Sequence, residues 1–286
     1  MVVLETDLHP ALPYSLADSC RLASDATRFF RDGVLTAALE VDGAPALAKV
    51  RQRRDGSLAV WIEGDRPEAA LERLRFVLAV DDSHAEFVRR FRDDRQIGAS
   101  VRVRPGRRPL RTATVTHALL KAVCGQLIQA KAARLLEAKL IRATTAEHHG
   151  LRLPPTRETF APLSPAALAR LGLVSRKASV LVRLSRQWDV ERLHGVPSAV
   201  AAARLERERG LGPWSSGMVS LYGLGHFDRG LVGDLGLVKL LSARTGRWVE
   251  AEETRALLEP FDEWAGLASL HLIGSPAAKQ SLRPAA

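Results

Sequence analysis

A single carboxylate and a glycine turn upstream of it are the residues of this sequence that suggest chemistry. The turn is Gly210-Leu211-Gly212, and Pro213 follows it at the first position of a predicted helix, a place that suits proline. The free amides of the turn and the positive end of the helix dipole would bind an anion such as phosphate. Asp234 follows as a lone acid among apolar residues. A phosphate-binding turn followed by a half-buried carboxylate predicts a reaction on a nucleic acid.

Each of these features also has a simpler interpretation. Gly-Leu-Gly-Pro on its own is more often an ordinary turn between two helices. Asp234 on its own would be the N-cap of a helix over residues 235–243, although a capping aspartate can still present one oxygen to a cleft. Gly223-Leu224-Gly225 is a second glycine motif, but no strand precedes it, so we expect a helix end there.

The chain is strongly basic, with a formal charge of +10 and an isoelectric point of about 10.4 over 286 residues. Most of this charge comes from arginine and favours a polyanionic partner. One arginine cluster fits either a DNA-facing role or a solvated linker. Its members are Arg102, Arg104, Arg107, Arg108 and Arg111.

The sequence predicts no metal centre and no membrane contact. The eight histidines are scattered, and His148-His149 lacks further ligands at metal-binding spacing. The two cysteines, Cys20 and Cys124, do not form a disulfide framework. Because neither a signal peptide nor a long apolar run is evident, we expect a soluble, cytoplasmic protein.

Hydrophobic patterning divides the chain into two regions. Strand-like runs over residues 34–41, 46–53 and 57–63 are separated by Asp-Gly pairs, which favour hairpins. Helical spacing follows near residues 67–80 and 83–92, and the pattern is nearly all helical from Thr114 onward. We therefore predict an α+β protein with an N-terminal antiparallel β domain and packed helices over residues 1–105, followed by an all-helical domain over residues 106–286.

The helical region resembles the helix-hairpin-helix DNA glycosylases, and within them the DNA-3-methyladenine glycosylase II (AlkA-like) branch. In that superfamily a Gly-hydrophobic-Gly hairpin joins two helices, and the catalytic aspartate lies just after the second helix. Further segments agree in order with the family's Gly-Gln-Leu turn, its second conserved helix pair and its closing helix: Val123–Ile128, residues 163–178 and residues 267–273. The N-terminal region is similar to the β domain that precedes the core in AlkA-like proteins.

The resemblance implies a role for each site residue. Asp234 would be the catalytic carboxylate. The residues implied to contact DNA are Gly210, Leu211, Gly212, Gln126 and Leu127. Leu127 falls where the family has a leucine that fills the gap left by an extruded base, and a buried core leucine is the alternative. Gln126 would either touch the orphaned base or brace the backbone.

Trp214 is implied to line the base pocket. Bifunctional relatives carry a lysine at this position, which forms a Schiff base that tryptophan cannot form. In AlkA-like proteins a tryptophan here stacks on a cationic base, and plain helix packing is the alternative. Met218, Leu235 and Ile273 stand at pocket positions where the AlkA pattern has aromatic residues. The thinner aromatic pocket leaves the substrate range open.

The resemblance therefore implies a monofunctional DNA glycosylase that excises alkylated purines of the 3-methyladenine type in base excision repair. After base flipping, the carboxylate would stabilise the oxocarbenium-like sugar and orient the attacking water. The implied partner is double-stranded DNA containing damaged bases, and we expect a monomer. We expect no cofactor beyond a monovalent cation, which the family's hairpin often holds through backbone carbonyls, and two cysteines are too few for the iron–sulfur cluster of some relatives. The alternatives are a glycosylase for another lesion, such as a deaminated purine, and a non-catalytic helix-hairpin-helix DNA-binding protein.

Overall fold

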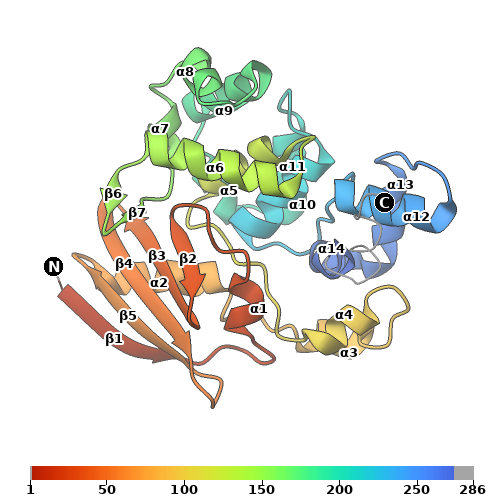
Figure 1. The fold of residues 1–286 in the computed structure, drawn as a ribbon, viewed down its shortest axis with the longest axis horizontal. Helices are drawn as coiled ribbons and strands as arrows, with labels where there is room; N and C mark the ends of the chain where they lie inside the picture. The colour runs from red at the N-terminus through yellow and green to blue at the C-terminus, as the bar shows by residue number, and fades with distance from the viewer. Residues whose placement is uncertain (1, 274–286) are drawn as a thin grey trace.

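The computed structural model describes residues 2–273 and confirms an α+β architecture. The N-terminal part is a five-stranded antiparallel sheet in the order β1-β5-β4-β3-β2. Its strands are β1 (Val2–Leu8), β2 (Arg28–Arg31), β3 (Val34–Val41), β4 (Ala44–Gln52) and β5 (Leu58–Gly64). The sheet lies at one end of the molecule, and helices form most of the rest (Figure 1).

Turn chemistry sets the register of the central strands. Asp42 and Gly43 join β3 to β4 with φ values of 50° and 75°, the left-handed pair that a two-residue hairpin needs. Val41 therefore pairs with Ala44. The three strands predicted around the Asp-Gly pairs are confirmed, whereas β1 and β2 were missed. β1 pairs with the distant β5, so no turn joins the two strands. β2 is joined to β3 by Asp32 and Gly33, with φ values of 51° and 76°, but its four residues are too few to show an alternating pattern.

One face of the sheet is covered by helix α2 (Pro67–Leu78). Its buried residues Leu74 and Val77 share a core with Leu35 and Ile62 of the sheet. The short helix α1 (Leu16–Cys20) contributes to the same core. Helix α2 is thus confirmed within two residues of the predicted end.

The other face of the sheet receives a two-stranded hairpin from the helical region, which corrects the prediction that this region is all helical. Its strands are β6 (Glu147–His148) and β7 (Leu151–Arg152), and Leu151 packs against Ala38 and Leu47. With two residues each, these strands are too short to show an alternating pattern.

A central helical lobe holds the predicted hairpin. Its elements are α5 (Val115–Gly125), α6 (Ala130–Thr144), α7 (Arg157–Phe160), α8 (Pro165–Arg170), α9 (Ser175–Gln187), η1 (Val190–Gly195), α10 (Ser198–Glu206), α11 (Pro213–Val219) and the π-helical turn η2 (Ser220–Leu224). The helix pair predicted over residues 163–178 is α8 and α9. Within the described part of the chain, no helix is both long and apolar enough to cross a membrane.

A third core joins the C-terminal helices to helices from the first hundred or so residues. The C-terminal elements are α12 (Leu235–Thr245), α13 (Glu253–Leu258), η3 (Glu259–Trp264) and α14 (Ala265–Ile273), and the earlier ones are α3 (Ala85–Phe91) and α4 (Gly98–Val103). Figure 1 shows α3 and α4 below α14. The predicted closing helix is confirmed as α14, and the division at residue 105 stays a prediction. Residues 274–286, the end of the predicted second domain, lie outside the described residues.

Two members of the arginine cluster lie in the interior, although both sequence interpretations implied an exposed position. Arg108 and Arg111 are only 1% and 5% exposed. The Arg108 guanidinium donates hydrogen bonds to backbone carbonyls, including that of Ala79 at 2.8 Å. Arg111 pairs with Asp82 and lies 4.7 Å from the centroid of the Phe76 ring. Both arginines therefore stabilise contacts in the interior of the protein, and a DNA-facing role for them is excluded.

Candidate active site

The hairpin lies between α10 and α11, with Pro213 in the first turn of α11 as predicted. Gly210 has a φ of 98°, and a Cβ there would lie 2.5 Å from Cγ2 of Val180. The fold therefore requires glycine at 210. A Cβ at Gly212 would meet nothing within 4 Å, so this glycine faces open space.

The middle residue of the hairpin has a structural role. Leu211 is 6% exposed and belongs to the core of the central lobe. Its amide is bonded to the carbonyl of Glu208 at 2.9 Å, so it is not one of the free amides expected for the turn. The predicted phosphate contact would therefore fall to the backbone around Gly212, while the Leu211 side chain anchors the turn.

The turn between α5 and α6 lies against the hairpin. Nε2 of Gln126 donates to the carbonyl of Gly210 at 2.8 Å and to Oγ of Ser215 at 3.0 Å. Gln126 therefore braces the backbone, one of the two roles expected for it. Leu127 is 99% exposed, with a φ of 59°, so the alternative of a buried core leucine is excluded.

Trp214 connects the hairpin to the carboxylate. Its indole Nε1 donates a hydrogen bond to Oδ2 of Asp234 at 3.0 Å. The edge of its ring also lies against the end of α5, where a Cβ on Gly125 would be 2.6 Å from Cη2 of the ring. The Gly-Gln-Leu turn, the hairpin helix and the predicted catalytic residue thus meet at one tryptophan.

Asp234 is both the N-cap of α12 and a candidate catalytic group. Oδ1 accepts a hydrogen bond from the amide of Gly236 at 2.8 Å, while Oδ2 accepts the bond from Trp214. Burial raises the pKa of Asp234 above its ordinary value, although the hydrogen bonds from Trp214 and from the helix amides oppose the rise. The N-cap role is therefore confirmed, and the catalytic role stays a prediction.

The remaining predicted pocket residues differ in their placement. Met218 and Ile273 are half-buried and pack in the same cluster as Trp214. Ile273 lies beside the start of α12, since a Cβ at Gly236 would be 3.4 Å from Ile273 and 3.0 Å from Oδ1 of Asp234. Leu235 is 38% exposed and does not join this cluster.

Tyr222 is an aromatic residue of this site that the sequence analysis missed. It follows Trp214 and Met218 at spacings of four residues, and all three pack in one cluster. In a regular α-helix, with 3.6 residues per turn, residue 222 would be rotated away from the face of Trp214. The wider π-helical turn at η2 brings Tyr222 back towards that face. Burial raises the pKa of the Tyr222 hydroxyl, and the charges of Lys121 and Asp234 both act on it, in opposite directions.

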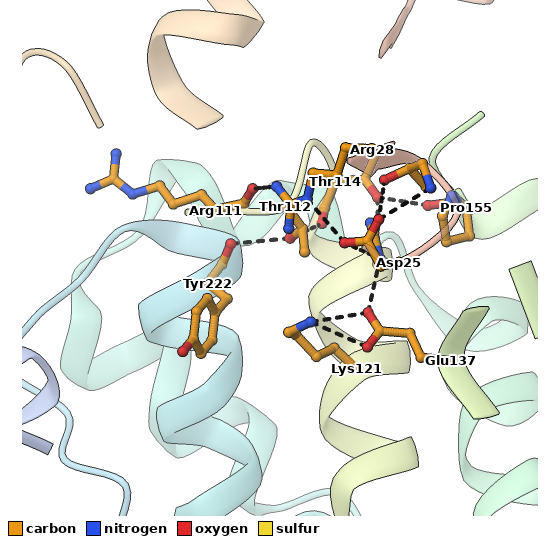
Figure 2. A network of polar contacts seen from close by, with 11 residues as sticks. Asp25, Arg28, Arg111, Thr112, Thr114, Lys121, Glu137, Pro155 and Tyr222 are labelled. Carbon is orange, nitrogen blue, oxygen red and sulfur yellow. Dashed lines mark hydrogen bonds and ion pairs between the residues drawn. The ribbon is translucent and has the colours of Figure 1, made fainter. Parts of the chain in front are cut away.

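A buried ionic network lies behind this face (Figure 2). Asp25, His117 and Glu137 place three potential ligand atoms within 4.8 Å of one another. Both carboxylates already have cationic partners, since Arg28 Nε is 3.0 Å from Asp25 and Lys121 Nζ is 3.2 Å from Glu137. Because Arg28 and Lys121 already neutralise the two carboxylates, Asp25, His117 and Glu137 do not favour binding of a divalent cation.

Comparison with solved structures places this arrangement in a known fold. The 3-methyladenine DNA glycosylase of Archaeoglobus fulgidus matches with a TM-score of 0.75 and 22% identity, covering 96% of this chain and 97% of that one. The apo form of the 8-oxoguanine glycosylase/lyase of Clostridium acetobutylicum matches with a TM-score of 0.73 and 15% identity, covering 95% and 98%. The chain has the fold of the helix-hairpin-helix DNA glycosylases. The fold that the resemblance implied is therefore confirmed.

The curated relatives are longer than this chain. Two Mycobacterium tuberculosis proteins, each described as a probable bifunctional transcriptional activator/DNA repair enzyme AlkA, are 26% identical over 208 residues. The match covers 71% of this chain but only 42% of each relative, so the chain spans less than half of their length. No family model matches the chain.

Proposed function

We propose that the protein is a monofunctional DNA glycosylase of the AlkA-like branch, which excises alkylated purines from double-stranded DNA in base excision repair. The observation that carries the proposal is the hydrogen bond between Trp214 and Asp234, because it sets a half-buried carboxylate beside an aromatic ring. The names of the similar glycosylases support the same reaction class.

The residues fit a base-flipping mechanism. The exposed Leu127 would enter the space left by the extruded nucleotide, while the hairpin around Gly212 binds the backbone phosphate. The base would stack on Trp214, and the Asp234 carboxylate would face the deoxyribose. As the N-glycosidic bond breaks, this carboxylate stabilises the positive charge on the sugar and orients the attacking water. An alkylated purine is already cationic and leaves without a strong general acid.

The absence of an amine at position 214 supports a monofunctional reaction. Tryptophan cannot form a Schiff base. Lys121 is the amine that lies against Tyr222, and it is paired with Glu137. Burial disfavours its charge, but the carboxylates of Glu137 and Asp25 outweigh burial and raise the pKa of Lys121. Lys121 is therefore protonated at neutral pH and is a poor nucleophile.

The proposal includes the oligomeric state and a cation at the hairpin. The protein acts as a monomer, and the hairpin carbonyls hold a monovalent cation when DNA is bound. The Gly210 carbonyl accepts a hydrogen bond from Gln126, so the neighbouring carbonyls would supply most of the ligands.

A panel of duplexes, each with one modified base, tests the proposed function. We expect release of the free base from duplexes with 3-methyladenine or 7-methylguanine, and strand breakage only after alkali. Specific binding without release of any base would instead identify a non-catalytic DNA-binding protein. Release of deaminated purines alone would assign the other glycosylase class.

A further inference from the structure

Lys121 and Tyr222 lie at the end of the Trp214 face that the proposed mechanism does not use. Helices α5 and α11–η2 run antiparallel here, since Gly125 lies against the ring of Trp214 and Ala118 lies against Gly223. Between these two contacts, Nζ of Lys121 lies 5.9 Å from the centroid of the Tyr222 ring. Lys121 therefore belongs to the same helix interface as the ring on which the base would stack.

The ammonium of Lys121 is held in position by the carboxylate of Glu137. Nζ lies 3.2 Å from both Oε1 and Oε2 of Glu137, whose side chain is 2% exposed. Glu137 also accepts a hydrogen bond from His117 at 3.1 Å if that ring nitrogen carries the proton. An ammonium has three N–H donors, and two carboxylate oxygens leave a third without a partner among the described residues. The Lys121 side chain is 20% exposed, so it is not completely enclosed by the core.

The network ties this lysine to the N-terminal part of the chain. Asp25 and Arg28 form an ion pair at 3.0 Å in which both side chains are 6% exposed, and Arg28 also donates to the carbonyl of Arg111. Figure 2 shows Lys121 between Glu137 on one side and Tyr222 on the other. A buried carboxylate such as Glu137 is stable only with its cationic partner, so the position of Lys121 is strongly constrained.

Tyr222 adds a second polar group at this end. It is half-buried, and its hydroxyl has no hydrogen-bond partner among residues 2–273. Its backbone carbonyl is fixed by the hydroxyl of Thr112 at 3.0 Å and by the amide of Thr112 at 2.8 Å. Tyr222 packs in the same cluster as Trp214 and Met218, so two hydrogen-bond donors, one of them charged, lie next to this cluster.

We propose that Lys121 and the Tyr222 hydroxyl read the edge of the extruded base, so that the enzyme favours purines with a keto oxygen at C6 over purines with an amino group at C6. This inference rests on the proposed glycosylase function and names its substrate class. A keto oxygen accepts a hydrogen bond from either group. An amino group at the same position is a donor, so it would be repelled by the N–H donors of the Lys121 ammonium. A charge-assisted hydrogen bond to a buried acceptor contributes about tenfold to hundredfold in discrimination.

The test compares three bases in single-turnover excision: 7-methylguanine and hypoxanthine, which carry the oxygen, and 3-methyladenine, which carries the amine. The variant is Lys121→Met combined with Glu137→Gln, so that no unpaired carboxylate stays buried. We expect this variant to lose about tenfold or more on both keto purines and less than about threefold on 3-methyladenine. The matched control is Lys139→Met, since Lys139 is exposed on α6 and has no ion pair within the described residues.

A smaller substitution keeps the test valid if the double variant does not fold. Tyr222→Phe preserves the ring and removes only the hydroxyl, and we expect a loss of several-fold confined to the keto purines. Equal losses on all three bases would overturn the inference, as would unchanged rates in both variants. Wild-type protein that releases 3-methyladenine but neither keto purine would also overturn it, while leaving the proposed function intact. Failure of the wild-type protein on every base would refute the proposed function itself.

Discussion

The indole of Trp214 donates a hydrogen bond to Oδ2 of Asp234, and the other oxygen of Asp234 caps helix α12. This arrangement fixes the carboxylate on both sides, and no residue within 2–273 forms an ion pair with it. An acid held by two neutral donors in a buried position keeps its negative charge available for a cationic transition state. The same geometry determines which variants keep the fold and lose only the reaction.

Asp234→Asn is expected to lower base release by about a hundredfold or more, because the amide cannot stabilise the positive sugar. Asparagine is also a good N-cap, so α12 should be retained. Single-turnover excision measures the loss, and binding to DNA with an abasic site should be nearly unchanged. Excision of 3-methyladenine by this variant at the wild-type rate would refute the catalytic assignment.

The pH dependence of excision reports on the same group. Burial raises the pKa of Asp234, so the active carboxylate is lost as the pH falls through a value above the ordinary aspartate pKa of about 3.9. We expect Trp214→Phe to shift this acid limb to higher pH, because the hydrogen bond that opposes the rise is removed. The measurement is the rate of base release against pH for both proteins. An acid limb that moves to lower pH would contradict this assignment.

The contribution of Asp234 to the free energy of unfolding should change with pH in the opposite direction to the excision rate. A carboxyl with a raised pKa in the folded state binds its proton more tightly there, so its contribution to the free energy of unfolding decreases as the pH rises through that range. Asp234→Asn removes this buried charge. At neutral pH the variant should therefore be as stable as the wild-type protein or more stable, as measured by urea denaturation.

Leu127 offers a separate test of base extrusion. Because its side chain is 99% exposed, Leu127→Ala should change the free energy of unfolding by less than about 0.5 kcal/mol. We expect excision from duplex DNA to fall by about tenfold, since nothing then fills the gap left by the base. Leu135→Ala is the matched control, because Leu135 is also an exposed leucine, on α6, with 64% of its side chain accessible. Equal effects of the two substitutions would exclude a wedge at Leu127.

The sequence identified the groups whose roles depend on local motifs. Gly210, Asp234 and Trp214 lie within or close to one motif of fixed spacing, so their approximate positions follow from the resemblance. Leu127 also follows from a short turn motif. What the sequence could not show is the hydrogen bond between Trp214 and Asp234, because it depends on how α11 meets the start of α12.

Residues whose roles depend on packing between distant helices were missed or misassigned. Tyr222 reaches the site only because a π turn changes the helical phase after Val219. Lys121 reaches it only because α5 runs antiparallel to α11–η2. Arg108 and Arg111 contributed to the charge that favoured a DNA partner, yet backbone carbonyls and Asp82 bind them in the interior. The number of arginines in a sequence does not show which of them are bound by backbone carbonyls inside the folded protein.

The hairpin glycines should separate folding from DNA binding. Gly210→Ala should destabilise the protein by about 1–3 kcal/mol, because its φ is positive and Val180 occupies the space. Gly212→Ala should cost less than about 1 kcal/mol but weaken binding to every duplex similarly, since a methyl group there lies where a phosphate approaches. Thermal denaturation and binding to undamaged and abasic duplexes provide the two readouts. A Gly212→Ala effect confined to one lesion would place the turn in the base pocket instead.

The reaction product tests the role of position 214. With tryptophan there and Lys121 paired to Glu137, borohydride should trap no covalent protein–DNA adduct, and the abasic strand should break only after alkali. In Trp214→Lys the new amine would lie beside Asp234, where the carboxylate favours its charged form, so we expect weak trapping and slower base release. The informative control is Lys121→Met with Glu137→Gln. Efficient trapping by the unmodified protein that disappears in this double variant would make Lys121 a lyase nucleophile and overturn the monofunctional assignment.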